Sequence, residues 1–91
     1  MSYQLIFAPR ALEDIRRIKK SGNKPVIKKL QMILQELMEH PTIGIGTPEL
    51  LRNRENTYSR RLNLKDRIVY SVHEDIVCVN ILQTLGHYND K

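Results

Sequence analysis

The sequence lacks the features that mark membrane, disulfide-bonded or metal-binding proteins. Its single cysteine, Cys78, cannot form a disulfide within the chain, so we expect a packed thiol in a reduced cytosol. No apolar run approaches the roughly 20 residues that a membrane helix needs, and the first residues lack a secretory signal pattern. With one cysteine and no closely spaced His, Asp and Glu set, neither a metal site nor a cofactor is predicted. We therefore expect a cytoplasmic protein.

Composition indicates one small folded domain, residues 1–91, with an anionic partner. Hydrophobic residues make up 41% of the chain and charged residues 27%, which suits a single two-layer core. The net charge is +5 and the isoelectric point is about 9.6, as expected for a protein that binds nucleic acid or an acidic protein. Much of this charge forms one local basic segment with six cations: Arg52, Arg54, Arg60, Arg61, Lys65 and Arg67.

Periodicity predicts two helices in the first half of the chain. Pro9 is suited to begin a helix, and Ser21-Gly22-Asn23 is suited to end it. A second helix begins near Pro25 and ends at His40-Pro41. Its apolar residues form one stripe at helical spacing: Val26, Ile27, Leu30, Ile33, Leu34, Leu37 and Met38.

Alternating and β-branched segments predict strands before and after the helices. The predicted strands are Tyr3–Phe7, Tyr58–Leu62, Arg67–Val72 and Ile76–Leu82. A loop with glycines at 44 and 46 leads from the second helix to Glu49. The order β-α-α-β-β-β predicts an α+β fold in which two N-terminal helices pack on a small, mainly antiparallel sheet.

The C-terminal half holds the groups that cleave RNA without a metal. The 2′-hydroxyl of RNA can attack the adjacent phosphate when a base, cations and an acid are supplied. Taken alone, Glu49 reads more simply as a surface residue after a turn, and the closing His87-Tyr88 pair as a frayed tail. Arg61 and Arg67 are six residues apart across a short turn, so antiparallel strands could present both to one phosphate. Arg60 must then face the opposite side, where it could pair with an acid or contact ribosomal RNA.

Four motifs in order give the chain a resemblance to the Txe/YoeB family of RelE-like toxins from bacterial toxin–antitoxin systems. The resemblance extends to the first helix, at residues 11–15, and so covers nearly the whole chain. Its departures are Tyr58 in place of a tryptophan, a shortened segment 53–57, Leu85 in place of a basic residue, and an extension after Tyr88. The motifs themselves are Gly46-Thr47-Pro48-Glu49-Leu50-Leu51-Arg52, Tyr58-Ser59-Arg60-Arg61-Leu62, Asp66-Arg67-Ile68-Val69-Tyr70 and His87-Tyr88.

The resemblance implies a toxin that enters the ribosomal decoding site and cleaves mRNA there. It also implies a neutralising antitoxin, which we expect to be acidic. The implied catalytic group is Glu49 with Arg67, His87 and Tyr88, and either His87 or Tyr88 supplies the acid. Arg52 and Arg61 are the implied phosphate-binding residues, and the basic segment nominates Arg60 and Lys65 as further RNA contacts. The predicted partners are thus the antitoxin, the ribosome and mRNA, and the chain could also form a homodimer.

Two other functions fit the same sequence less well. A non-catalytic basic protein could inhibit translation by occupying the ribosome or RNA, and it would tolerate loss of Glu49. A ParE-like toxin would share the fold but bind DNA gyrase. Such relatives generally lack the Glu, Arg and terminal His set, which makes this alternative the weakest of the three.

Overall fold

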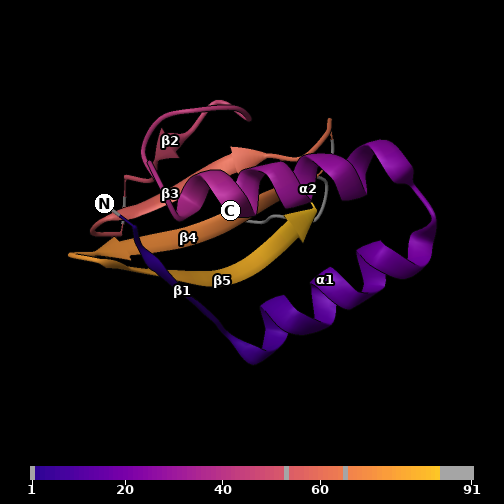
Figure 1. The fold of residues 1–91 in the computed structure, drawn as a ribbon, viewed down its shortest axis with the longest axis horizontal. Helices are drawn as coiled ribbons and strands as arrows, with labels where there is room; N and C mark the ends of the chain where they lie inside the picture. Colours follow the sequence, from indigo (N-terminus) through magenta and orange to yellow (C-terminus); the bar gives the residue numbers. More distant parts are fainter. Residues whose placement is uncertain (1, 53, 65, 85–91) are drawn as a thin grey trace.

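The computed structural model describes residues 2–52, 54–64 and 66–84, which form two helices and a five-stranded sheet (Figure 1). The strands lie in the order β1-β5-β4-β3-β2, with β1 parallel to β5 and the other pairs antiparallel. The predicted α+β class with a mainly antiparallel sheet is confirmed. The strands are β1 (Gln4–Phe7), β2 (Glu49–Leu50), β3 (Thr57–Arg61), β4 (Asp66–His73) and β5 (Ile76–Thr84).

The first helix has the end signals that the sequence predicts, whereas the second ends at Leu37, before the predicted end at His40-Pro41. Helix α1 (Pro9–Ser21) has a proline in its first turn, and it ends where Gly22 adopts the left-handed conformation with φ of 76°. Helix α2 (Lys24–Leu37) begins after Asn23, whose side chain accepts a hydrogen bond from the Val26 amide at 3.3 Å. Gly22 and Asn23 thus fix the end of α1 and the start of α2.

The core lies between the helices and one face of the sheet, with α2 crossing in front of the strands in Figure 1. Helical spacing places one stripe of α2 in this layer, and its residues Leu30, Ile33 and Leu37 are buried. Alternation along the strands supplies the opposing side. The buried sheet residues of this core are Ile68, Tyr70, Val77 and Val79.

Strand β2 is an addition that the sequence did not predict. It contains only Glu49 and Leu50, and both side chains are exposed. Two exposed residues carry neither an alternating pattern nor a buried run, so periodicity cannot detect such a strand. Its existence depends on pairing with β3, and this pairing brings Glu49 onto the sheet.

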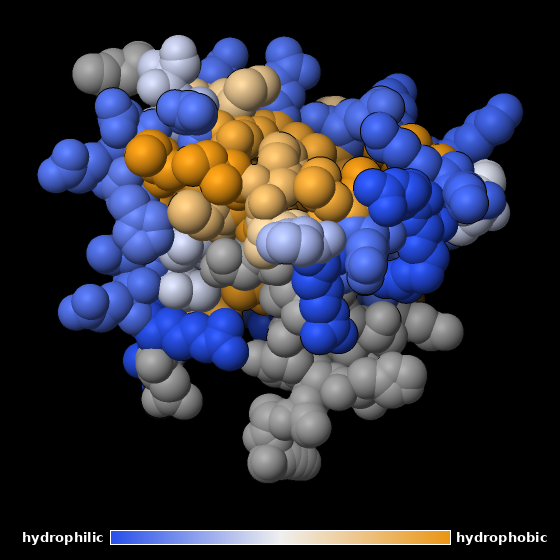
Figure 2. Space-filling view, turned by 90° about the horizontal axis from the view of Figure 1, so that it is seen from below, coloured by the Kyte–Doolittle hydropathy of each residue, from blue (hydrophilic) through white to orange (hydrophobic). Residues whose placement is uncertain are grey.

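An apolar surface lies on the side of the molecule that carries β1 and α1. Seen from below, apolar residues gather at the centre of this side, with hydrophilic residues around them (Figure 2). On these elements, Ile6 is 44% exposed and Leu12 is 45% exposed. Neither helix among the described residues has the length and apolar character needed to cross a membrane.

Candidate active site

Glu49 is positioned by β2 at the edge of the sheet. Its partner in the β3 register is Ser59, and directly opposed residues of antiparallel strands project from the same face. The Glu49 side chain is exposed, so a ligand can reach its carboxylate from solvent. The tertiary pairing therefore turns a loop-end glutamate into an accessible group on one face of the sheet.

Arg61 and Arg67 lie directly opposite each other on β3 and β4. The turn between them is closed by Asn63, whose Oδ1 accepts from the Asp66 amide at 2.7 Å and whose Nδ2 donates to Asp66 Oδ2 at 3.2 Å. Directly opposed side chains have Cβ atoms about 4.5–5.5 Å apart, so the two guanidiniums can approach one phosphate. The pairing of these arginines on one face agrees with their spacing in the sequence.

Ser59 connects the glutamate to the arginine pair. It lies two residues before Arg61 on β3, which puts it on the same face, and it is 3% exposed. Its Oγ accepts a long hydrogen bond of 3.4 Å from Arg67 Nη1. Ser59 was not among the predicted site residues, although its alternation with Arg61 and its place in the motif were available signals.

These four residues define what we call the Glu49 face: Glu49, Ser59, Arg61 and Arg67. They come from three neighbouring strands, β2, β3 and β4. A carboxylate beside two guanidiniums can accept a proton while the cations stabilise negative charge on a phosphate. The Glu49 face thus brings a carboxylate and two guanidiniums together on one face of the sheet.

The other predicted site residues have different outcomes. Arg52 is exposed in the turn after β2. Lys65, His87 and Tyr88 lie outside the residues that the structure describes. Among the described residues, no group of three or more His, Cys, Asp or Glu side chains is placed to hold a metal ion.

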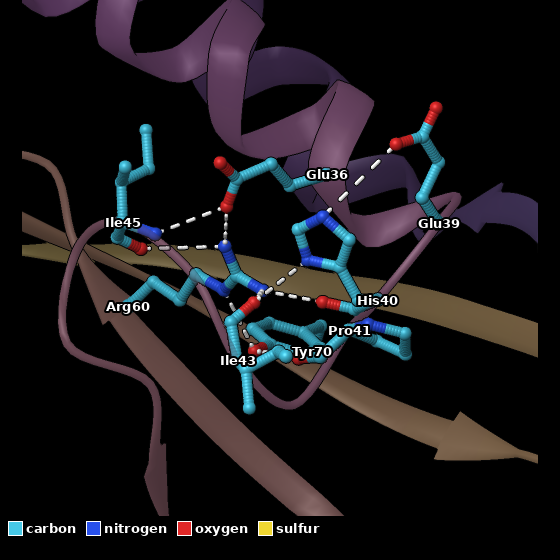
Figure 3. Close-up of polar contacts among 8 residues, drawn as sticks. All are labelled: Glu36, Glu39, His40, Pro41, Ile43, Ile45, Arg60 and Tyr70. Atoms are coloured by element: carbon cyan, nitrogen blue, oxygen red, sulfur yellow. Dashed lines mark hydrogen bonds and ion pairs between the residues drawn. The ribbon is translucent and has the colours of Figure 1, made fainter.

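Arg60 lies on the opposite face of β3, within the core, where its side chain is 0% exposed (Figure 3). Its Nη1 donates to Glu36 Oε1 at 2.7 Å, and its Nε donates to the Tyr70 hydroxyl at 3.1 Å. This burial corrects the prediction that Arg60 contacts RNA, because its guanidinium has no access to a ligand. Of the two roles considered for Arg60, pairing with an acid is the one observed.

Glu36 on α2 was missed at the sequence level because it lies 24 residues before Arg60. Burial raises the pKa of the Glu36 carboxyl. The hydrogen bonds from Arg60 and the Ile45 amide, together with the charges of Arg60 and His40, lower this pKa by more than burial raises it. The resulting pKa lies below the ordinary value of glutamate, so Glu36 is ionised at neutral pH. Arg60 is therefore a charge paired inside the fold.

Tyr70 completes this buried polar group from β4. Burial raises the pKa of its hydroxyl by more than the hydrogen bond and charge of Arg60 lower it. The hydroxyl therefore keeps its proton, and it donates to the Pro41 carbonyl oxygen at 2.6 Å. One phenol thus joins the arginine to the backbone segment that follows α2.

Comparison with known proteins decides the family. The family model for the YoeB-like toxin of bacterial type II toxin-antitoxin systems matches residues 7–88. The chain belongs to the YoeB-like toxin family. The matched range includes both helices, the Glu49 face and the closing His87-Tyr88 pair, in agreement with the resemblance seen in the motifs.

Individual proteins that are similar to this YoeB-like toxin support the family assignment. Toxin YoeB of Synechocystis is 33% identical over 52 residues, which cover 56% of this chain and 60% of the relative. That alignment thus spans less than two thirds of the relative's own length. Among solved structures, the YoeB dimer of Staphylococcus aureus superposes with a TM-score of 0.78 at 27% identity, covering 99% of this chain and 100% of that one. The YoeB–YefM heterotetramer of the same organism gives a TM-score of 0.75 at 28% identity, with the same coverage.

The lowered pKa of Glu36 gives a testable pH dependence for the stability of this YoeB-like toxin. A carboxyl with a lowered pKa in the folded state stabilises above its unfolded pKa, and this contribution is lost as pH falls through the folded pKa. Replacing Glu36 by glutamine should therefore lower the free energy of unfolding at pH 7 by about 1 kcal/mol, a discounted value because the side chain is 23% exposed. At pH 3 the difference between wild type and variant should be smaller.

Urea unfolding of both proteins at pH 7 and pH 3 measures this effect. Only the difference between the two proteins is informative, since every other carboxyl titrates in both. Glu39→Gln is the matched control, because Glu39 is exposed just after α2 and lies outside the Arg60 pair. An equal difference between wild type and Glu36→Gln at both pH values would contradict the expected charge-dependent contribution.

Proposed function

We propose that this chain is the toxin of a type II toxin–antitoxin system and that it cleaves mRNA in the ribosomal decoding site. The proposal depends on one observation: the strand register gathers Glu49, Arg61 and Arg67 on one face of three neighbouring strands. Membership in the YoeB-like toxin family supports the same function. Because the nucleophile is the 2′-hydroxyl, RNA is the expected substrate and DNA is not.

The proposed reaction is an internal transfer at phosphorus that needs no metal ion. The Glu49 carboxylate accepts the proton of the 2′-hydroxyl, and the 2′-oxygen forms a bond to the adjacent phosphorus. Arg61 and Arg67 stabilise the negative charge that develops on the phosphate oxygens. The bond from phosphorus to the 5′-oxygen breaks, and His87 or Tyr88 supplies the proton to that oxygen. The products are a 2′,3′-cyclic phosphate and a 5′-hydroxyl end.

Cleavage of an mRNA programmed into bacterial ribosomes tests the proposal directly. We expect a cut within the decoding site and a cyclic phosphate on the upstream fragment, also when the protein has been treated with EDTA before it is added. The second candidate is a non-catalytic inhibitor, which the basic composition favours. It would stop translation while the mRNA remained intact, and this outcome would remove Glu49 from the mechanism.

An acidic antitoxin is the proposed protein partner. The chain carries a net charge of +5, and the sheet ends in two edge strands, β1 and β2, that could pair with an added strand. The YoeB of Staphylococcus aureus has been solved in complex with YefM. Co-purification from the native cell that yielded no tightly bound acidic protein would contradict this part of the proposal.

RNA affinity should depend steeply on salt because the proposed contacts are to phosphates. If Arg52 neutralises one phosphate and Arg61 together with Arg67 neutralises another, the logarithm of the affinity for a short oligoribonucleotide falls by about 1.4 per tenfold rise in salt. Arg52→Ala should reduce this slope by about 0.7, since one contact is lost. Lys24→Ala is the control, because Lys24 is exposed at the start of α2 and away from the Glu49 face. Fluorescence titrations at several salt concentrations give the slope, and a flat response would contradict the proposed binding surface.

A further inference from the structure

The segment 40–48 forms most of the connection between α2 and β2 and so determines where Glu49 lies. It contains turns and bends but no helix or strand. Glu49 itself belongs to a strand of two residues at the edge of the sheet, and pairing over so short a length holds its position weakly. The position of Glu49 therefore depends on how the segment 40–48 is held in place.

Arg60 holds the backbone of this segment from inside the molecule (Figure 3). Its Nη2 donates to the carbonyl oxygens of His40 at 3.0 Å and Ile43 at 2.8 Å. Its Nη1 donates to the carbonyl oxygen of Ile45 at 3.3 Å. Because the guanidinium is planar and its donors are fixed relative to one another, these bonds set the three carbonyls in one arrangement.

Two glycines let the segment come this close to Arg60. A Cβ on Gly44, whose φ is 131°, would overlap Glu36 Oε1 and meet Arg60 Nη1 at 3.0 Å. A Cβ on Gly46, whose φ is 80°, would meet the Arg61 carbonyl oxygen at 2.9 Å. The glycines at 44 and 46 are thus explained by the close approach of this backbone to β3 and α2.

The connection from these bonds to Glu49 is short and stiff. The Gly46 carbonyl accepts from the Arg61 amide at 2.7 Å, which ties the segment to β3. Thr47 follows at φ of 51°, a conformation that a β-branched residue keeps only where its surroundings impose it. The φ of Pro48 is restricted by its ring. Displacement of the segment near Ile45 would therefore be passed on to Glu49.

We infer that Arg60 is a positioning residue for RNA cleavage, because it holds the segment 40–48 and thereby keeps Glu49 in register beside Arg61 and Arg67. The inference rests on the proposed cleavage function. Arg60 contacts no substrate, since it is buried on the helix side of the sheet. Neighbouring arginines of β3 thus have separate tasks: Arg61 faces the ligand side, and Arg60 orients the loop that brings in the carboxylate.

The variant Arg60→Lys tests this inference while keeping a positive charge near Glu36. A lysine lacks the planar fork that reaches three carbonyls together. The Leu51 amide donates to the Thr57 carbonyl at 2.8 Å and reports the β2–β3 pairing. Its hydrogen exchange is expected to become about tenfold faster or more, as local opening becomes easier. The Ala8 amide, bonded to Val79 at the far edge of the sheet, should change much less.

Single-turnover cleavage on programmed ribosomes supplies a second readout that separates positioning from binding. A misplaced base lowers the rate after binding, so the maximal rate should fall about 10- to 100-fold. The ribosome concentration that gives half the maximal rate should change by less than about twofold. Ile33→Val is the control, because it weakens the buried face of α2 without removing any hydrogen bond of Arg60. It should leave the maximal rate and the Leu51-to-Ala8 exchange ratio unchanged.

Two results would overturn the inference. The first is an Arg60→Lys variant whose maximal cleavage rate and Leu51 exchange equal those of the wild type. The second is an Ile33→Val variant that shows the same slower cleavage and faster Leu51 exchange as Arg60→Lys. If Arg60→Lys does not fold, Gly46→Ala keeps both Arg60 and Glu36 and displaces the segment, because its Cβ would meet the Arg61 carbonyl oxygen at 2.9 Å, and the same results are expected. Failure of the proposed function looks different: wild type leaves the mRNA intact, while the Leu51 exchange still decides whether Arg60 holds β2 in place.

Discussion

Replacing Glu49 by glutamine is expected to slow cleavage of ribosome-bound mRNA by about 10²- to 10⁴-fold, the range typical for loss of a general base. The amide has the shape of the carboxylate but does not accept the proton of the 2′-hydroxyl. The fold should be preserved, because the Glu49 side chain is exposed and is not part of the core. Single-turnover cleavage on programmed ribosomes measures the rate, and urea unfolding verifies the fold.

Glu55→Gln is the matched control for this prediction. Glu55 is also an exposed glutamate near the basic segment, but it lies in the turn before β3 and not on the Glu49 face. The two variants change the net charge equally, so an electrostatic effect on ribosome binding would appear in both. Equal rates for Glu49→Gln and wild type would rule out Glu49 as the base and favour a non-catalytic inhibitor.

Replacing Arg60 by methionine is expected to lower the free energy of unfolding by about 3 kcal/mol, the cost of breaking a buried ion pair and its hydrogen bonds. Three kinds of group lose a hydrogen bond from Arg60 in this variant: the Glu36 carboxylate, the Tyr70 hydroxyl and the backbone carbonyls of the segment 40–48. The value lies at the lower end of the range for buried pairs because Glu36 is partly exposed and can be hydrated. For a domain of this size the melting temperature should fall by more than about 10 °C.

Arg61, which follows Arg60 on β3, provides a matched control for the stability of the Arg60→Met variant. Arg61→Met makes the same chemical change one position along β3, but Arg61 is exposed, so the free energy of unfolding should change by less than about 0.5 kcal/mol. Urea unfolding of the two variants at pH 7 measures both effects. Similar losses for Arg60→Met and Arg61→Met would contradict the expected difference between a buried, ion-paired Arg60 and an exposed Arg61.

The Arg60-Arg61 pair shows how far a strand pattern predicts a site. Alternation along β3 requires the two side chains to face opposite sides, and this requirement holds in the structure. The sequence could not choose between an acid and RNA as the contact of Arg60. Glu36 is on α2, and only the packing of that helix on the sheet brings the carboxylate to the guanidinium.

For Glu49, the sequence predicts a role but not the residues that lie beside it in the fold. Its place in the motif predicts a role, yet its neighbours in the sequence say nothing of which side chains it meets. The register of β2 on β3 places it opposite Ser59, and the register of β3 on β4 brings Arg67 within hydrogen-bond reach of that serine. Strand pairing between distant segments is a non-local property, so spacing along the chain does not determine it.

The sequence by itself determined both helices, the long strands, the α+β class and the family, because periodicity, caps and motif order are local and leave a direct signal. The tertiary structure alone decided that β2 exists, that Glu49 shares a face with Arg61 and Arg67, and that Arg60 is buried against Glu36. Each of these features arises from contacts between segments far apart in the chain. Burial then separates two adjacent arginines into one that holds the fold and one that remains open to a phosphate.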